Sequence, residues 1–262
     1  MLHNPVIDTL LNRKSIRSFK PEQPSQEVIE TIVLAGQQAP FAYQLGSLLL
    51  SRNSQVNPWN APLYFIILVD AHRFECIMAQ RGWEMATNDL SLLVLGIQDA
   101  ALMAENMVIA AESLGLGSCF LGGVPYQAAQ IIREYQLPPR VFPLVSLAMG
   151  YPASNPPTRP RYPLEFCLFE DRYPQLDPEM VQRAMQVMDD GYLAQDYYRK
   201  ANYMIPLDGA REEQYTFENY SWTEHISRKL GLWQRSPKSI LSAFKKCGFH
   251  IPAATQPEKE AK

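Results

Sequence analysis

The stretch from Gln98 to Val124 reads QDAALMAENMVIAAESLGLGSCFLGGV, and the prediction of the fold starts from it. Its first part contains no Gly or Pro and is rich in Ala, Leu, Met and Glu, the residues that lose least on entering a helix. Apolar residues cover nearly the whole circumference of this helix, and Asp99, Glu105 and Glu112 form only a thin polar stripe. We therefore expect a helix buried on most sides, in a large core or against another subunit.

The same stretch ends in a short strand and a glycine pair. Gly115 and Gly117 stop the helix, residues 118–121 predict a buried strand, and Gly122 and Gly123 follow at once. A glycine pair after a strand exposes backbone N–H groups at no steric cost, so a planar ligand could lie against them. The alternative is a core helix followed by a tight turn with no ligand.

Composition excludes several classes of protein. A chain of 262 residues with 47% hydrophobic content can bury a large core, in one domain or two. The net charge of −3 argues against a nucleic-acid-binding protein. The four cysteines form no CxxC pair, which argues against a disulfide framework or a metal site and favours a reducing compartment. Without an apolar leader or an uninterrupted apolar stretch of about 18 residues, the chain is expected in the cytoplasm and not in a membrane.

The segment RKSIR at residues 13–17 places three cations and a hydroxyl within five positions. Guanidinium, ammonium and hydroxyl donors suit a phosphate or another anion, which makes Arg13, Lys14, Ser15 and Arg17 candidate ligand-binding residues. The alternative is an ordinary solvated basic patch at the end of a helix.

A second group of cations follows much later in the chain. Arg159 and Arg161 alternate with proline in a proline-rich segment, so both can point to one side of a stiff backbone at low entropic cost. The two groups could close on one anion, or this segment could be a solvent-facing linker.

The remaining residues predict helices and strands without a regular alternation. Apolar runs at residues 63–69 and 141–149 predict two buried strands. Capping patterns predict helices that begin after Asn4, Ser25 and Asp177, the last of them continuing to Lys200. Other helices are expected at residues 127–135, 222–230 and 237–246, with one or two short ones at 72–97. The fold class is therefore α+β.

No nucleophile–base pair, P-loop or dinucleotide-binding glycine motif is present in the sequence, so a cofactor would have to supply any chemistry. The motifs are similar to those of the flavin-dependent nitroreductase family, in particular its oxygen-insensitive NADPH nitroreductases and NADPH:flavin oxidoreductases. The resemblance covers most of residues 4–250 and rests on NRKSIRSF, a loop beginning with AP, the stretch from Gln98, GYPASNPPTRPRYP and WTEHISRKL.

The resemblance implies a nitroreductase-like fold with a mixed or antiparallel central sheet flanked by helices. It implies one domain at residues 1–250 with a helical extension at about 175–250, followed by a disordered tail at 251–262. It also implies a homodimer in which the long helix forms much of the contact and FMN lies between the subunits.

The resemblance further implies roles for single residues. Arg13, Lys14, Ser15, Arg159 and Arg161 would hold the FMN phosphate. Arg17 would face the N1–O2 edge of the flavin ring, Gln55 the N3–O4 edge, and Gly122 and Gly123 would offer N–H groups to N5. No metal is implied. NADPH or NADH would give hydride to N5 and leave, and a nitroaromatic, quinone or flavin would then take two electrons.

Two positions depart from the family pattern. Phe41 stands where a small hydroxyl residue is expected near the ribityl chain, so either FMN binds more weakly or Gln44 replaces the missing donor. Ala201 stands where relatives have an arginine for the NADPH 2′-phosphate, which leaves Arg199, Lys200 and Arg211 as alternatives. These departures keep open a second function, an FMN-binding carrier or regulatory protein with little turnover.

Overall fold

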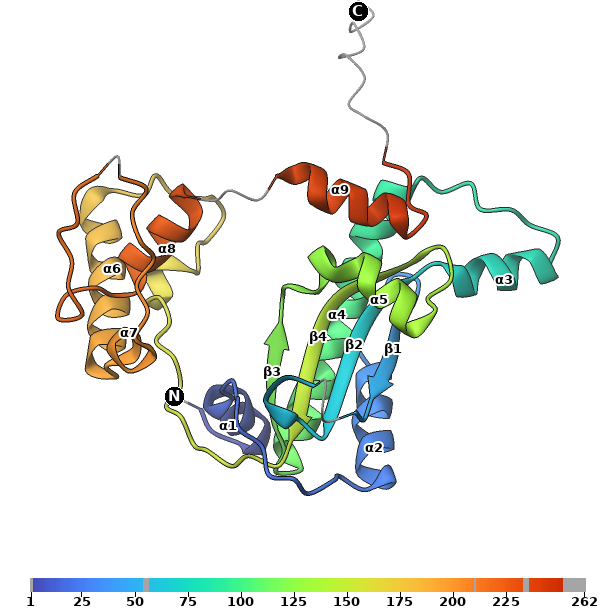
Figure 1. Cartoon of the computed structure of the whole chain (residues 1–262), viewed down its shortest axis with the longest axis horizontal. Helices are drawn as coiled ribbons and strands as arrows, with labels where there is room; N and C mark the ends of the chain where they lie inside the picture. Colours follow the sequence, from blue (N-terminus) through green and yellow to red (C-terminus); the bar gives the residue numbers. More distant parts are fainter. Residues whose placement is uncertain (1, 54–56, 210, 233–235, 252–262) are drawn as a thin grey trace, which may run out of the picture. The chain divides into compact units, whose positions relative to one another are not determined.

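The computed structural model describes residues 2–53, 57–209, 211–232 and 236–251 (Figure 1). The chain forms two compact units, and each is described by itself. Unit 1 comprises Met1–Pro156 and Ser236–Lys262, and unit 2 comprises Pro157–Arg235. Gln55 and the tail from residue 252 onward lie outside the described residues, so the predictions for them have no structural counterpart.

Unit 1 is built on a four-stranded sheet with the strand order β1-β2-β4-β3. Its strands are β1 (Gly46–Ser51), β2 (Leu63–Asp70), β3 (Gly117–Leu121) and β4 (Val141–Gly150), and each neighbouring pair is antiparallel. The two predicted buried strands, β2 and β4, are the central ones. Together with the helices around the sheet, this confirms the α+β class.

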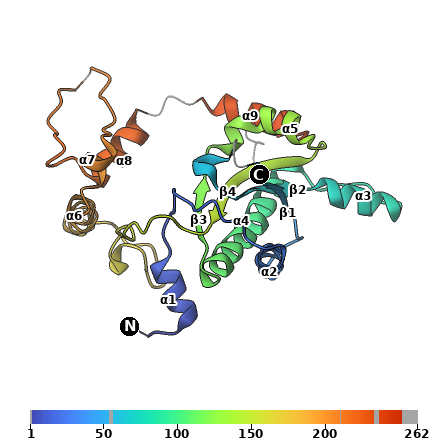
Figure 2. The ribbon, with the colours of Figure 1, turned by 60° about the horizontal axis from the view of Figure 1, so that its bottom comes forward.

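Side chains of β2 enter cores on both faces of the sheet. Phe65, Ile67 and Val69 belong to the larger core, whereas Ile66 and Leu68 belong to a smaller cluster. Figure 2 shows α4 (Asp89–Ser113) and α2 (Gln26–Gln37) on one face and α5 (Ala128–Tyr135) on the other. Because both faces are covered, β2 is a continuous apolar run and not an alternating one.

The long helix α4 begins earlier than the sequence predicted. It starts at Asp89 and not near Gln98, and the side chain of Asn88 caps its first turn. Of the short helices expected at residues 72–97, only α3 (His72–Gln80) is separate. Gly96 lies inside α4, where a Cβ would lie 2.4 Å from Cγ1 of Val69. It therefore allows the helix to approach β2 closely and does not end the helix.

One face of α4 is buried and another is exposed. Asp99, predicted to belong to a polar stripe, is only 4% exposed. The exposed face carries a row of apolar residues that we call the α4 stripe: Leu90, Val94, Ile97 and Ala101. By length and composition α4 could cross a membrane, contrary to our expectation, but half of its most apolar window is buried inside the protein. That burial is typical of a core helix.

Capping side chains begin the helices as predicted. At the start of α1 (Pro5–Asn12), the N–H of Ile7 donates a hydrogen bond to Oδ1 of Asn4 over 2.9 Å. Ser25 caps α2, and Asp177 caps α6 (Pro178–Ala194). The last helix, α9 (Pro237–Lys246), belongs to unit 1, where the rings of Phe244 and Phe142 lie 4.7 Å apart.

Unit 2 contains α6, α7 (Tyr197–Ala201) and α8 (Trp222–Gly231) around a core rich in tyrosine. The helix predicted to continue to Lys200 is interrupted, because Asp196 has a left-handed backbone with φ of 54°. In this core the Tyr220 hydroxyl lies 3.1 Å from Nδ1 of His225. Burial lowers the pKa of His225, with a smaller contribution from Lys229. This histidine is a structural residue of the core.

Candidate functional site

The basic segment at residues 13–17 lies along the edge strand β3. The N–H of Ile16 donates to the carbonyl of Ser118 over 2.8 Å, and Ser15 forms a parallel bridge with Ser118. The side chain of Ile16 is buried against Gly117, where a Cβ would lie 2.4 Å from Cγ1 of Ile16. The buried isoleucine anchors the segment and leaves its polar neighbours at the surface.

The same segment continues beside the end of β4. The N–H of Lys20 donates to the carbonyl of Tyr151, and the N–H of Ala153 donates to the carbonyl of Ser18. Nζ of Lys14 donates to Oδ1 of Asn155 over 2.5 Å. The structure thus brings the first basic segment next to residues 151–155, where the proline-rich segment begins.

The charges of the basic segment face one carboxyl group of α4. Burial raises the pKa of Glu112, and Arg13, the hydroxyl of Ser118 and Lys14 offset only part of that rise. Arg17 is exposed, and its guanidinium lies 5.8 Å from the ring centroid of Trp59. Residues 13–17 thus carry two guanidinium groups, an ammonium and a hydroxyl within a short length of chain, and these donors are suited to binding an anion.

The glycine pair forms an open turn at the other end of β3. Gly122 and Gly123 are exposed, and a Cβ built on either would meet no atom within 4 Å. The residues after them form a short 3-10 helix, η2 (Val124–Gln127). The turn is therefore accessible from outside unit 1, as a planar ligand lying against its backbone would require.

The loop before β1 is held by Asp99. Its carboxylate accepts the N–H groups of Ala42, Tyr43 and Leu45 at 2.6, 3.1 and 3.0 Å. A carboxylate that accepts several backbone N–H groups strongly constrains the loop that donates them. The exposed side chains of Phe41 and Tyr43 lie on this loop.

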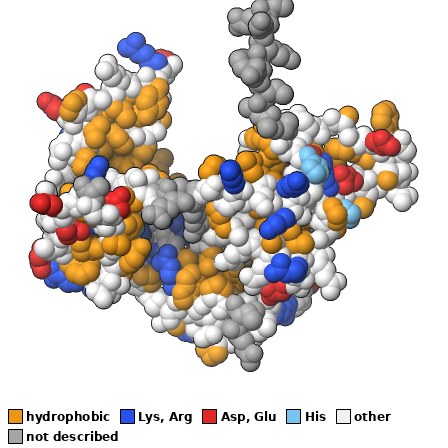
Figure 3. All heavy atoms as spheres, turned by 45° about the horizontal axis from the view of Figure 1, so that its top comes forward, with side chains coloured by type: hydrophobic (Ala, Val, Ile, Leu, Met, Phe, Trp, Pro, Cys, Tyr) orange, Lys and Arg blue, Asp and Glu red, His pale blue; other side chains and the backbone are white. Residues whose placement is uncertain are grey.

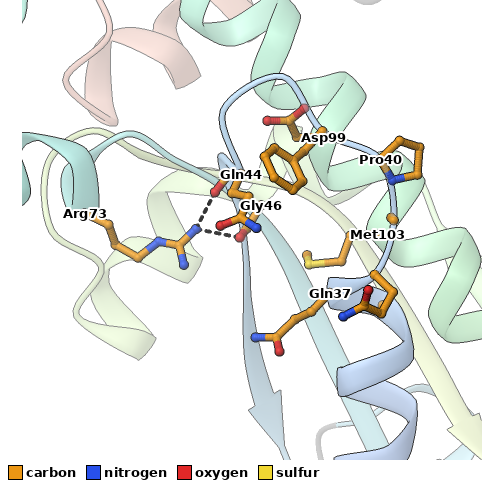
Figure 4. A pocket seen from close by; sticks show the side chains of 11 residues that line it. Gln37, Pro40, Gln44, Gly46, Arg73, Asp99 and Met103 are labelled. Atoms are coloured by element: carbon orange, nitrogen blue, oxygen red, sulfur yellow. Dashed lines mark hydrogen bonds between the residues drawn. The ribbon is translucent and has the colours of Figure 1, made fainter.

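The loop borders a cavity of about 310 Å³ (Figure 4). Arg73 lies at one side and donates to the carbonyls of Gln44 and Gly46 at 2.8 and 2.6 Å. Gln37, Pro40 and Met103 lie on other sides of the cavity. Gln44, the alternative donor for a ligand, is exposed and has a left-handed backbone with φ of 55°.

Unit 2 holds the second group of cations. Nη1 of Arg159 donates to Oε1 of Gln195 over 2.5 Å, and its guanidinium lies 4.1 Å from the ring centroid of Tyr197. Nη1 of Arg161 donates to the carbonyls of Arg159 and Pro160. Both arginines are thus oriented by neighbouring groups of unit 2.

The three alternatives for a nucleotide phosphate have different environments. Arg199 forms ion pairs with Glu218 and Asp196, which raise its pKa. Nζ of Lys200 donates to the carbonyl of Gln195 over 3.0 Å. Arg211 is exposed and lines a second cavity, of about 470 Å³, which lies in unit 2.

Arg228 in that second cavity was missed by sequence reasoning. It is 5% exposed, and its terminal nitrogens donate to both carboxylate oxygens of Glu213 at 2.7 Å each, while Nε donates to Glu224 over 2.7 Å. These bonds lower the pKa of Glu213. The only sequence signal for such a clamp was the Glu-Arg spacing of four within α8.

Two other features of the described residues concern metal binding and the distribution of surface charge. No group of three or more His, Cys, Asp or Glu side chains there could hold a metal ion. On the face of the molecule shown in Figure 3, Lys and Arg side chains are scattered among apolar and neutral groups. The cations that the sequence analysis singled out lie in two local groups, at residues 13–17 and 159–161.

An antiparallel sheet with a long core helix, a basic segment along its edge strand and an open glycine turn is the combination expected of the nitroreductase class. The chain belongs to the nitroreductase family, whose model matches residues 10–51 and 49–151.

Similar proteins with known names cover nearly the whole chain. It is 28% identical to the FMN reductase (NADPH) of Bacillus subtilis, over 94% of this chain and 99% of the relative. It is 27% identical to the oxygen-insensitive NADPH nitroreductase of Salmonella typhimurium, over 87% and 91%. The structure of the NADPH:FMN oxidoreductase of Vibrio harveyi, complexed with NAD+, matches with a TM-score of 0.73 and 25% identity, over 94% and 99%. These matches confirm the family that the motifs indicated.

Proposed function

We propose that this protein is an NAD(P)H oxidoreductase that uses FMN to reduce nitroaromatics, quinones or flavins in a two-electron ping-pong reaction. The observation that carries the proposal is the hydrogen bond between Ile16 and Ser118. It joins the cations of residues 13–17 to the strand that ends at the open Gly122–Gly123 turn. A phosphate-bearing planar cofactor needs both features. Relatives named as FMN reductases and NADPH nitroreductases support the same function.

The donor set fits FMN. Arg13, Lys14 and Ser15, with Arg159 and Arg161, are proposed to hold the phosphate. The chemistry of these side chains supports this, because guanidinium groups bind phosphate oxygens in pairs and a lysine adds a point charge.

The ring of FMN is proposed to lie against Gly122 and Gly123, whose backbone N–H groups would hydrogen-bond to N5. Arg17 is proposed at the N1–O2 edge, where a fixed positive charge stabilises the negative charge that develops on reduction. Gln55, outside the described residues, is proposed at the N3–O4 edge. When bound, FMN would supply the hydride chemistry, and the side chains would orient it and tune its potential.

A homodimer is proposed because of the α4 stripe. Leu90, Val94, Ile97 and Ala101 follow one another at intervals of four, three and four residues, the spacing of a helix–helix seam. Exposed apolar rows of this kind mark interfaces between proteins. Residues 1–250 are then proposed to act as one nitroreductase-like domain in each subunit, with the helical extension at about 175–250.

The electron donor is proposed to be NADPH or NADH, and the protein is proposed to work in the cytoplasm. Cys76, Cys119, Cys167 and Cys247 are all free thiols, which suits a reducing compartment. For the 2′-phosphate of NADPH, Arg211 is the preferred candidate, because Arg199 is already paired with two carboxylates.

The test is the anaerobic oxidation of NADPH by protein that has been loaded with FMN and freed of excess flavin, in the presence and absence of an added nitroaromatic, quinone or flavin. Oxidation that depends on both protein and acceptor is expected. Tight binding of FMN without such oxidation would favour the alternative of an FMN carrier. The names of the relatives favour the enzyme.

A further inference from the structure

The segment that carries Arg159 is seated on the last turns of α6. A Cβ built at Gly191 would lie 2.5 Å from Cγ of Pro160. Only glycine lets the proline approach the helix this closely. The contact fixes the backbone next to Arg159 against α6.

Gln195 connects the same segment to the end of α6 through both ends of its amide. Oε1 accepts from Nη1 of Arg159 over 2.5 Å, and Nε2 donates to the carbonyl of Thr158 over 2.8 Å. One side chain thereby binds both the backbone and the guanidinium of the segment. This arrangement determines which way the guanidinium edge points.

Tyr197 supplies a flat support for the guanidinium. The Cζ atom of Arg159 lies 4.1 Å from the centroid of the ring, well within cation–π range. The hydrogen bond to Gln195 uses one of the five N–H donors of the guanidinium. Stacking on the ring uses the face of the group, so its edge is still suited to a bidentate contact with phosphate.

We propose that Gln195 and Tyr197 are positioning residues, which hold Arg159 in the conformation that binds the FMN phosphate. The inference rests on the proposed function. An arginine held in advance loses less rotamer freedom on binding, so the ligand binds more tightly. The pair acts on the phosphate end of FMN and leaves the reactivity of the ring unchanged.

The experiment compares FMN with riboflavin, which has the same ring and no phosphate. Apoprotein is titrated with each flavin, and binding is followed by the quenching of flavin fluorescence. Tyr197→Leu and Gln195→Ala are each expected to weaken FMN binding about tenfold and to leave riboflavin binding unchanged. Tyr197→Phe, which keeps the ring, is expected to bind FMN like the wild type.

The matched control is Tyr173→Leu, which removes an exposed tyrosine of unit 2 that packs edge to face against Phe169. It is expected to change neither affinity. A double-mutant cycle provides the second control: in an Arg159→Ala background, Tyr197→Leu is expected to have no further effect on FMN binding. Thermal unfolding of each apoprotein identifies variants that do not fold. If Tyr197→Leu does not fold, Gln195→Ala carries the test alone.

The outcomes separate this inference from the proposed function. Wild-type protein that binds no FMN would overturn both. Wild-type protein that binds FMN, with unchanged affinity in Tyr197→Leu and Gln195→Ala, would overturn the positioning role alone. An equal loss of FMN and riboflavin affinity would also overturn it, because a general disturbance of unit 2 does not depend on the phosphate.

Discussion

The N–H of Ile16 donates a 2.8 Å hydrogen bond to the carbonyl of Ser118, and this bond and the bridge between Ser15 and Ser118 hold the N-terminal segment against the edge strand β3. Arg13, Lys14 and Arg17 are therefore attached to β3 and do not belong to a free terminus. The role proposed for Arg17 depends on this attachment, because a cation must be fixed in place to stabilise charge developing on a bound ring.

Removal of that cation gives the first prediction. Arg17→Ala is expected to leave the fold intact, to lower FMN affinity and to slow reduction by NADPH about tenfold or more. FMN titration and anaerobic stopped-flow measurements check both effects. Lys20→Ala, an exposed cation of the same segment, is the control and is expected to behave like the wild type. Unchanged FMN affinity and reduction rate in Arg17→Ala would remove this residue from the site.

The second prediction concerns the loop held by Asp99. Asp99→Ala leaves three backbone N–H groups without their acceptor, and it is expected to lower the free energy of unfolding by about 3 kcal/mol. Urea unfolding of the apoprotein measures the loss. Glu105→Ala, which changes an exposed carboxylate of the same helix, is expected to stay within about 0.5 kcal/mol of the wild type. Equal stability of the two variants would show that Asp99 does not hold the loop.

The third prediction is a pH dependence. Burial raises the pKa of Asp89, but hydrogen bonds from the N–H of His250 and from Arg140 more than offset this, so its pKa lies below the ordinary 3.8. A carboxyl with a lowered pKa stabilises the folded state above its unfolded pKa. The stabilisation is lost as the pH falls through its folded value.

Thermal unfolding of Asp89→Asn against the wild type tests this. The variant is expected to be less stable by about 2 kcal/mol near neutral pH, and the difference is expected to shrink below about pH 3.8. Asp8→Asn is the control, since Asp8 forms an exposed pair with His3 and should contribute little. A difference that stays constant down to pH 2 would contradict the assignment.

The fourth prediction concerns assembly. Val94→Lys places a charge in the middle of the α4 stripe and is expected to convert a dimer into a monomer, because an unpaired charge in an interface must be desolvated. Light scattering during gel filtration gives the mass directly. Leu168→Lys alters an exposed leucine of unit 2 and is expected to remain dimeric. A wild-type protein that is monomeric at micromolar concentration would contradict the proposed dimer.

Local sequence signals predicted most of the fold. The caps Asn4, Ser25 and Asp177 act over three residues, so the helices that they begin were found from the sequence. The predicted start of α4 was wrong: the predicted stretch begins at Gln98, after Gly96, whereas Gly96 lies inside α4 and packs closely against Val69, a contact that exists only in the folded chain. A local pattern cannot distinguish a glycine that ends a helix from one that packs against a strand.

Residues whose partners are distant in the sequence were not predictable. Asp99 was assigned to a polar stripe, but its partners lie on a loop more than fifty residues earlier. Tyr197 and Gln195 lie far from Arg159 in the chain, and nothing local relates them to it. The basic motifs were predictable because their chemistry lies within a few consecutive residues, whereas the groups that orient them are brought together by folding.

The most direct test of the account is a visible absorption spectrum of the purified protein after incubation with FMN and removal of the excess, repeated after anaerobic addition of NADPH. The account predicts a flavin spectrum that bleaches with NADPH and returns when a quinone or a nitroaromatic is added. A protein that stays colourless, and cannot retain added FMN, would contradict it.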